Sequence, residues 1–93
     1  MVVGSISWQL SLPGCGSLKE KRAVVRSLKD RLRHRFNISV AETAHQDVLT
    51  RAELSAAVVS ADGRFVESVL DKLDHFVETE ARAVIVGTRR ELF

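Results

Sequence analysis

Apolar and polar residues alternate in the first segment of the chain, most clearly from Ser5 to Leu12. Four even positions carry the large apolar residues Ile6, Trp8, Leu10 and Leu12, and the odd positions between them carry Ser5, Ser7, Gln9 and Ser11. A period of two over this length predicts a β-strand over residues 2–12, with one face buried and the other face small and polar. Pro13 and Gly14 follow and are expected to end the strand.

A basic amphipathic helix is predicted directly after this turn. Ser17 is a typical N-cap residue, and Glu20 stands three positions later, which is the spacing of a capping box. An apolar stripe then recurs at helical spacing and consists of Leu18, Val25, Leu28, Leu32 and Phe36. We expect the helix to end near Asn37, because asparagine tolerates the left-handed conformation that often closes a helix.

Two further strands follow the helix. Residues 38–44 alternate weakly, and residues 51–60 are rich in alanine and valine. The polar residues 45–50 separate them, and two strands joined by a short connection indicate an antiparallel hairpin.

A second helix and a last strand complete the chain. Asp62 and Gly63 open the helix, and its apolar positions from Phe65 to Val77 fall at i, i+3, i+4 and i+7. Residues 83–88 are an apolar run of strand length. The resulting order β-α-β-β-α-β is that of the ferredoxin-like α+β fold, a four-stranded antiparallel sheet with two helices on one face. We expect residues 1–93 to form a single domain, because so short a chain cannot build two cores.

One face of this sheet is left without a helix. On it we expect Ser5, Ser7 and Gln9 of the first strand, with Ser55, Ala57 and Val59 beside them. A flat face with small side chains is either solvated or covered by a partner. Association of two identical chains through it, giving a homodimer, is the simplest candidate.

Composition places the protein in the cytoplasm. Cys15 is the one cysteine and cannot form an internal disulfide, which suits a reducing compartment. The apolar runs are far shorter than the roughly 20 residues needed to cross a bilayer, and the N-terminus lacks the features of a signal peptide. We therefore expect a cytoplasmic protein without a membrane segment.

The formal net charge of +2 conceals a strong asymmetry. Residues 18–36 carry eight lysines and arginines against two acids, a net charge of +6, whereas residues 62–80 carry six acids against two basic residues, a net charge of −4. A helix face this basic indicates an anionic partner such as RNA. The candidate anion-binding residues are Lys19, Lys21, Arg22, Arg26, Lys29 and Arg33. The alternatives are a solvated helix face, or one that is neutralised by the acidic second helix.

Nothing in the sequence forms a complete catalytic or metal-binding set. His45, Asp47 and Arg51 make the one polar cluster that resembles a ligand or recognition site. One histidine and one carboxylate are too few for a metal site, and no nucleophile accompanies them. The turn before the first helix lacks the spacing of a nucleotide-binding loop. We therefore expect no cofactor, no metal and no catalytic residue.

Base stacking on the sheet is also not expected. An RNA-recognition sheet needs aromatic residues on its first and third strands. Residues 51–60 contain no aromatic residue, and Trp8 falls on the buried parity of the first strand. If RNA is bound, the basic helix would carry the contact.

The motifs SLKEKR, VAE, HQD and RAEL occur in this order at residues 17–22, 40–42, 45–47 and 51–54. In combination they resemble the YlxP-like family of small bacterial proteins of unknown function, over nearly the whole chain. The resemblance implies a ferredoxin-like fold that is often dimeric. It also implies genes that neighbour those of a transcription elongation factor, translation initiation factor two and a ribosome-binding factor. It implies no catalytic residues.

The leading hypothesis is a non-enzymatic, RNA- or ribosome-associated factor that uses its basic helix. A homodimeric protein–protein adaptor is the first alternative. The second is a small-ligand-binding regulatory domain around His45, Asp47 and Arg51.

Overall fold

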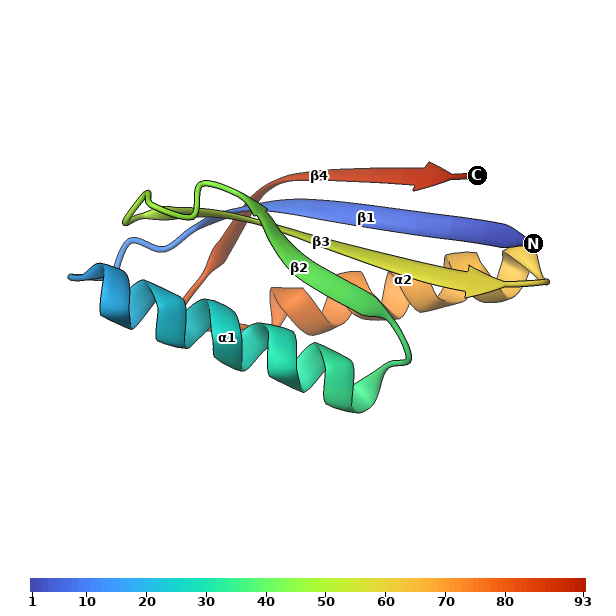
Figure 1. Ribbon diagram of the computed structural model, residues 1–93, viewed down its shortest axis with the longest axis horizontal. Coiled ribbons are helices and arrows are strands. Elements are labelled where there is room, and N and C mark those ends of the chain that lie inside the picture. Colours follow the sequence, from blue (N-terminus) through green and yellow to red (C-terminus); the bar gives the residue numbers. More distant parts are fainter.

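The computed structural model describes residues 1–93, and its elements follow the order that the sequence predicts. In chain order they are β1 (Val2–Ser11), α1 (Leu18–Arg35), β2 (Ser39–Ala44), β3 (Arg51–Ser60), α2 (Gly63–Glu78) and β4 (Val84–Leu92). The strands form one antiparallel sheet in the order β2-β3-β1-β4. Both helices lie on the same side of the sheet (Figure 1), so the predicted ferredoxin-like fold is confirmed.

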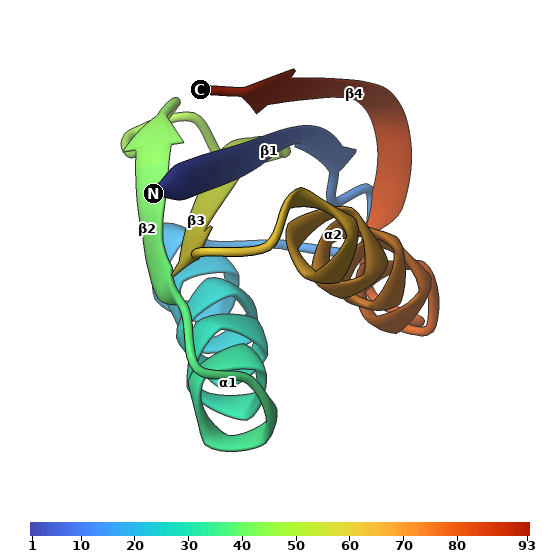
Figure 2. The same cartoon turned by 90° about the vertical axis from the view of Figure 1, so that its right-hand side faces the viewer.

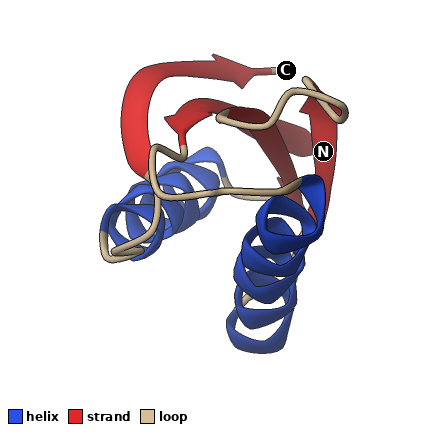
Figure 3. Cartoon of the chain, turned by 90° about the vertical axis from the view of Figure 1, so that its left-hand side faces the viewer, coloured by secondary structure: helices blue, strands red, loops and turns tan.

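The two helices cover different parts of this face. α1 packs beneath β2, whereas α2 packs beneath β1, β3 and β4. Figures 2 and 3 show the helices side by side under the sheet from its two ends, with the opposite face of the sheet uncovered. The side of α1 that faces away from α2 therefore lies near the β2 edge of the sheet.

The core lies between the sheet and the helices. Seventeen buried apolar residues form one cluster, and the alternation of β1 places Ile6, Trp8 and Leu10 within it. Trp8 has no exposed surface, and its indole N–H donates to a carboxylate oxygen of Asp74 on α2 at 2.9 Å. A buried indole requires such an acceptor. This hydrogen bond connects β1 to α2.

The predicted capping residues begin α1, with one difference in the reciprocal bond. The backbone N–H of Glu20 donates to the Ser17 hydroxyl at 3.1 Å, as in a capping box. The Glu20 carboxylate in turn accepts from the backbone N–H of Gly16 at 2.8 Å, one residue before the N-cap. This hydrogen bond connects the turn at residues 13–16 to the first turn of α1.

The end of α1 lies near Asn37 as expected, but its backbone geometry differs from the expectation. The helix ends at Arg35, and Phe36 follows as C-cap with an extended backbone, φ −127°. Asn37 does not have a positive φ, and the one non-glycine residue that does is His45, at 64°. Phe36 leaves the helix in order to pack against the core, so the left-handed ending that we expected at Asn37 is absent.

Strand β4 is longer than the apolar run 83–88 that predicted it. It continues to Leu92, and Phe93 then exchanges two backbone hydrogen bonds with Val3, at 2.8 and 3.1 Å. The additional residues include charged side chains because β4 is an outer strand with much exposed surface. Arg90 turns toward α2, where its guanidinium lies 2.6 Å from Asp71.

Neither helix combines the length and the apolar character that a membrane crossing would require.

Candidate nucleic-acid interface

Five basic residues form a row along the outward side of α1. We call Lys19, Arg22, Arg26, Lys29 and Arg33 the basic row. At about 100° of rotation per residue, they fall within a sector of about 80°. Four of them are exposed and Lys29 is half-buried.

Contacts at both ends of the basic row fix its direction. The Arg33 guanidinium donates to the backbone carbonyl of Val40 on β2 at 2.9 Å. Arg22 lies 3.9 Å from Asp47, in the connection between β2 and β3. The basic row therefore faces away from α2 and runs beside β2.

Few carboxylates oppose the basic row. Arg22 and Asp47 have side chains that are 59% and 91% exposed, and Arg33 lies 3.6 Å from an exposed Asp30. Exposed pairs of this kind contribute about 0–1 kcal/mol and are screened by salt. Lys19, Arg26 and Lys29 have no carboxylate within 4 Å.

The acidic residues of α2 do not neutralise the basic row. Asp71 and Asp74 pair with Arg90 of β4, and Glu78 pairs with His75 of its own helix. Glu80, just after α2, does reach α1, but it binds Arg31, which lies outside the basic row. The alternative of two helices that neutralise each other therefore applies to Arg31 and not to the basic row.

Lys21 is a correction to the predicted set. Its side chain has no exposed surface, and its ammonium group lies 3.2 Å from the carboxylate of Glu42. The same group donates to the backbone carbonyls of His45 and of Gln46, the latter at 3.3 Å. Lys21 cannot contact a polyanion because it is enclosed by protein acceptors.

The spacing of the buried residues of α1 indicates that Lys21 is buried, a signal that our sequence analysis missed. Lys21 precedes Val24, Val25 and Leu28 by three, four and seven positions, so it lies on the buried face of α1. Its partner Glu42 has the same strand parity as the buried Val40. A lysine and a glutamate that both fall on inward positions indicate a buried pair.

In the cluster of His45, Asp47 and Arg51, the first two residues lie on the connection between β2 and β3, and Arg51 is the first residue of β3. All three residues are exposed, and His45 turns the chain with its positive φ. Asp47 contacts Arg22, so this connection adjoins the basic row. No group of three or more potential metal ligands is present in the protein. An exposed turn argues against a ligand pocket around these residues.

The uncovered sheet face carries the small residues that the sequence places there. The hydroxyls of Ser7 and Ser55 lie 2.8 Å apart across β1 and β3. Our sequence analysis missed the centre of this face, the carboxylate of Glu53, which accepts from Gln9 at 2.5 Å and from the hydroxyl of Thr43. The hydrogen bond from Thr43 is the main cause that lowers the pKa of Glu53. This face is thus polar and internally bonded at its centre.

Solved structures with similar folds support the architecture. A de novo designed protein with ferredoxin fold, LFR1 1, aligns with a TM-score of 0.54 at 12% identity, covering 99% of this chain and 85% of the design. SnoaB, a cofactor-independent oxygenase from Streptomyces nogalater, aligns with a TM-score of 0.52 at 14% identity, covering 99% of this chain and 90% of SnoaB. At such identities the likeness shows the fold alone.

Sequence relatives identify the family. The chain is 30% identical to the uncharacterized protein YlxP of Bacillus subtilis (strain 168) over 92 residues, covering 99% of this chain and all of that protein. Residues 3–90 match the family described as protein of unknown function DUF503. The chain therefore belongs to the DUF503 family, which confirms the resemblance to YlxP-like proteins.

Proposed function

We propose that this protein is a binding factor rather than an enzyme, and that it binds RNA through the basic row of α1. The observation that carries the proposal is that no acidic residue of α2 pairs with the basic row. Positive charge on one side of a helix concentrates a polyanion there.

The length of the basic row favours an extended polyanion over a single phosphate. Lys19 and Arg33 are fourteen residues apart, which corresponds to about 21 Å along a helix. Such a row can follow several phosphates of one backbone. Because these contacts are to phosphates, we expect strong salt dependence and little sequence preference.

Ribosomal RNA is the form of RNA that we propose. The support is the gene neighbourhood that goes with the resemblance to YlxP-like proteins. The uncovered sheet face is not a candidate for binding single-stranded RNA by base stacking. Its β1 and β3 positions carry no aromatic residue on which a base could stack.

The test is a charge reversal of the three members of the basic row that have no carboxylate within 4 Å. A Lys19→Glu, Arg26→Glu, Lys29→Glu variant should lose most of its binding to a short RNA duplex, measured by fluorescence anisotropy at several salt concentrations. Each lost phosphate contact should lower the slope of log affinity against log salt by about 0.7–0.9. The matched control, Arg64→Glu, Lys72→Glu, Arg89→Glu, makes the same change in net charge elsewhere. Equal binding by the two variants would contradict the proposal.

Homodimerisation through the uncovered sheet face is the second candidate function, as part of a protein–protein adaptor. The observation that favours it is the set of small side chains around Ser7, Ser55 and Ala57, which allows close approach of a second sheet. Sedimentation should then show a dimer that is indifferent to salt, and Ala57→Arg should convert it to a monomer. A wild-type monomer at high protein concentration would refute this candidate.

A further inference from the structure

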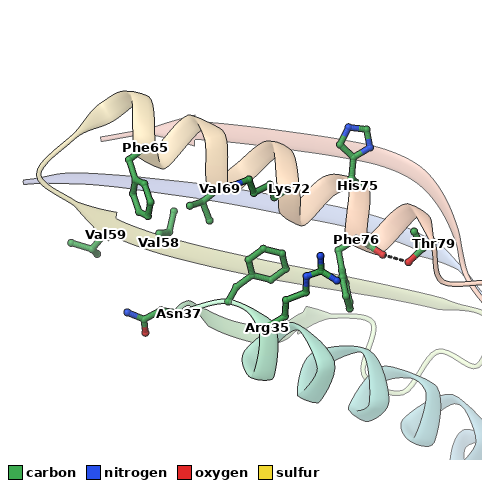
Figure 4. Close-up of a pocket in the computed structure, with 11 residues that line it drawn as sticks. Arg35, Asn37, Val58, Val59, Phe65, Val69, Lys72, His75, Phe76 and Thr79 are labelled. Carbon is green, nitrogen blue, oxygen red and sulfur yellow. Dashed lines mark hydrogen bonds between the residues drawn. The ribbon is translucent and has the colours of Figure 1, made fainter.

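A groove of about 730 Å³ opens between the C-terminal end of α1, the end of β3 and the side of α2 that faces them. Figure 4 shows Phe76 and Val69 of α2 along it, with Arg35 of α1 opposite and Phe65 at its far end. Its size falls within the roughly 300–1,000 Å³ of small-molecule pockets. No residue of the basic row lines it.

The apolar part of the groove is already formed. The rings of Phe36 and Phe76 pack edge to face, with centroids 5.9 Å apart and planes at 88°. Phe65 adds a third ring that is 54% exposed. An aromatic side chain left this exposed in the same groove as two others provides apolar area that a ligand can cover.

Positive charge borders this apolar surface, and no carboxylate does. Arg35 and Lys72 line the groove, and no aspartate or glutamate is among its lining residues. The Arg35 guanidinium lies 5.9 Å from the ring centre of Phe36 and 5.6 Å from that of Phe76. Neither Arg35 nor Lys72 has a carboxylate within 4 Å, so both cations are available to a ligand.

We propose that this groove binds a small organic anion, a carboxylate with an aliphatic or aromatic body. The body covers Phe65, Val69 and Phe76, and the carboxylate lies between Arg35 and Lys72. An uncharged ligand of the same shape would leave both cations without a partner. A cationic one would be repelled.

The groove is separate from the proposed RNA surface. Arg35 follows Arg33 by two positions, which turns it about 200° around the helix axis. It therefore faces α2, whereas the basic row faces away from it. The two proposals can thus fail independently.

Octanoate is a suitable probe, with octan-1-ol as its uncharged counterpart. In a titration of the full chain followed by ¹H–¹⁵N NMR, octanoate should shift the amides of Phe36, Val69 and Phe76. Octan-1-ol should bind about fivefold more weakly, the difference expected for one partly solvated charge pair. Equal affinity for the two compounds, or amide shifts outside the groove, would overturn the proposal.

Two charge reversals separate this site from the RNA surface. Lys72→Glu should weaken octanoate binding by about fivefold or more and leave RNA binding unchanged. Lys29→Glu, an equal change in net charge, should weaken RNA binding and leave octanoate binding unchanged. Phe65→Ser removes an exposed ring outside the core and should also weaken octanoate binding. A groove that instead holds a base of RNA would show itself by loss of RNA binding in Phe65→Ser, which would overturn the small-anion proposal.

Discussion

The ammonium group of Lys21 lies 3.2 Å from the carboxylate of Glu42 and joins α1 to β2 beneath the sheet. The lysine side chain is fully buried and that of the glutamate is 15% exposed. Lys21 also satisfies the carbonyls of His45 and Gln46, where the chain turns toward β3. One side chain thus positions the connection that adjoins the basic row.

Removal of this ammonium group should destabilise the fold strongly. Lys21→Met keeps most of the side-chain volume but leaves the Glu42 carboxylate without its counter-charge and two backbone carbonyls without their donor, which costs about 3–5 kcal/mol. Urea unfolding measures the loss, and the variant Lys19→Met, at an exposed position of the same helix, should change stability by less than about 0.5 kcal/mol. The double variant Lys21→Met, Glu42→Gln should recover part of the loss. A single variant as stable as wild type would show that the pair is dispensable.

The hydrogen bond from Trp8 to Asp74 leads to a second prediction. Asp74→Ala leaves the buried indole N–H without an acceptor, which should cost about 1–3 kcal/mol in unfolding free energy. Asp74→Asn retains an acceptor oxygen and should recover much of the lost unfolding free energy. Fluorescence of Trp8, the sole tryptophan, follows the unfolding transition. Asp71→Ala breaks an exposed pair with Arg90 and should cost far less; equal losses in the two alanine variants would argue against this role of the indole.

Stability should fall in acid through Glu80. The hydrogen bond from the Arg82 side chain is the main cause that lowers the pKa of this carboxyl to about 2, from 4.5. Because the folded-state pKa is depressed, the stabilisation is fully present above pH 4.5 and is lost as the pH falls from there toward 2. It amounts to about 3 kcal/mol.

The comparison of wild type with Glu80→Gln tests this pH dependence. Wild type should be the more stable at pH 7, and the difference should disappear in the acid range. Glu67→Gln changes an exposed carboxyl of α2 and should follow wild type at every pH. A constant difference between wild type and Glu80→Gln from pH 7 to pH 2 would contradict the assignment.

β1 lies close to α2 at Gly4. A Cβ atom at this position would lie 2.3 Å from a methyl carbon of Val66, which is too close for any real contact. Gly4→Ala should therefore cost about 1–3 kcal/mol through overpacking. At Gly87, on β4, the nearest atoms to an added Cβ are 3.6 Å away, so Gly87→Ala should be nearly neutral. Thermal unfolding of both variants checks this, and equal melting temperatures would refute it.

The fold was predictable because its signals are local. The alternation through Ile6, Trp8 and Leu10 and the Ser17 cap each depend on a few neighbouring residues, and the structure confirms them. The charged half of β4 gave no such signal. It pairs with β1 through backbone hydrogen bonds, which do not depend on apolar side chains.

The candidate sites were less predictable, because they depend on residues far apart in the chain. Lys21 has the charge of its neighbours, and the partner that withdraws it from solvent stands twenty-one positions later, at Glu42. The groove combines Phe36 with Phe65 and Phe76 of another helix. The spacing within α1 places Lys21 on the buried face, but no motif within one segment identifies Glu42 as its partner or brings the three rings of the groove together.

The two outer strands also explain how an open sheet avoids polymerisation. An unpaired strand edge is a template for further strands, and proteins commonly protect it by shortness or charge. β2 has six residues, and the Arg33 guanidinium occupies the carbonyl of Val40. At the other edge, the second half of β4 carries Arg89, Arg90 and Glu91, all of them exposed. Both edges are thus guarded against edge-to-edge aggregation, and at β2 the same arginine belongs to the surface that we propose for RNA.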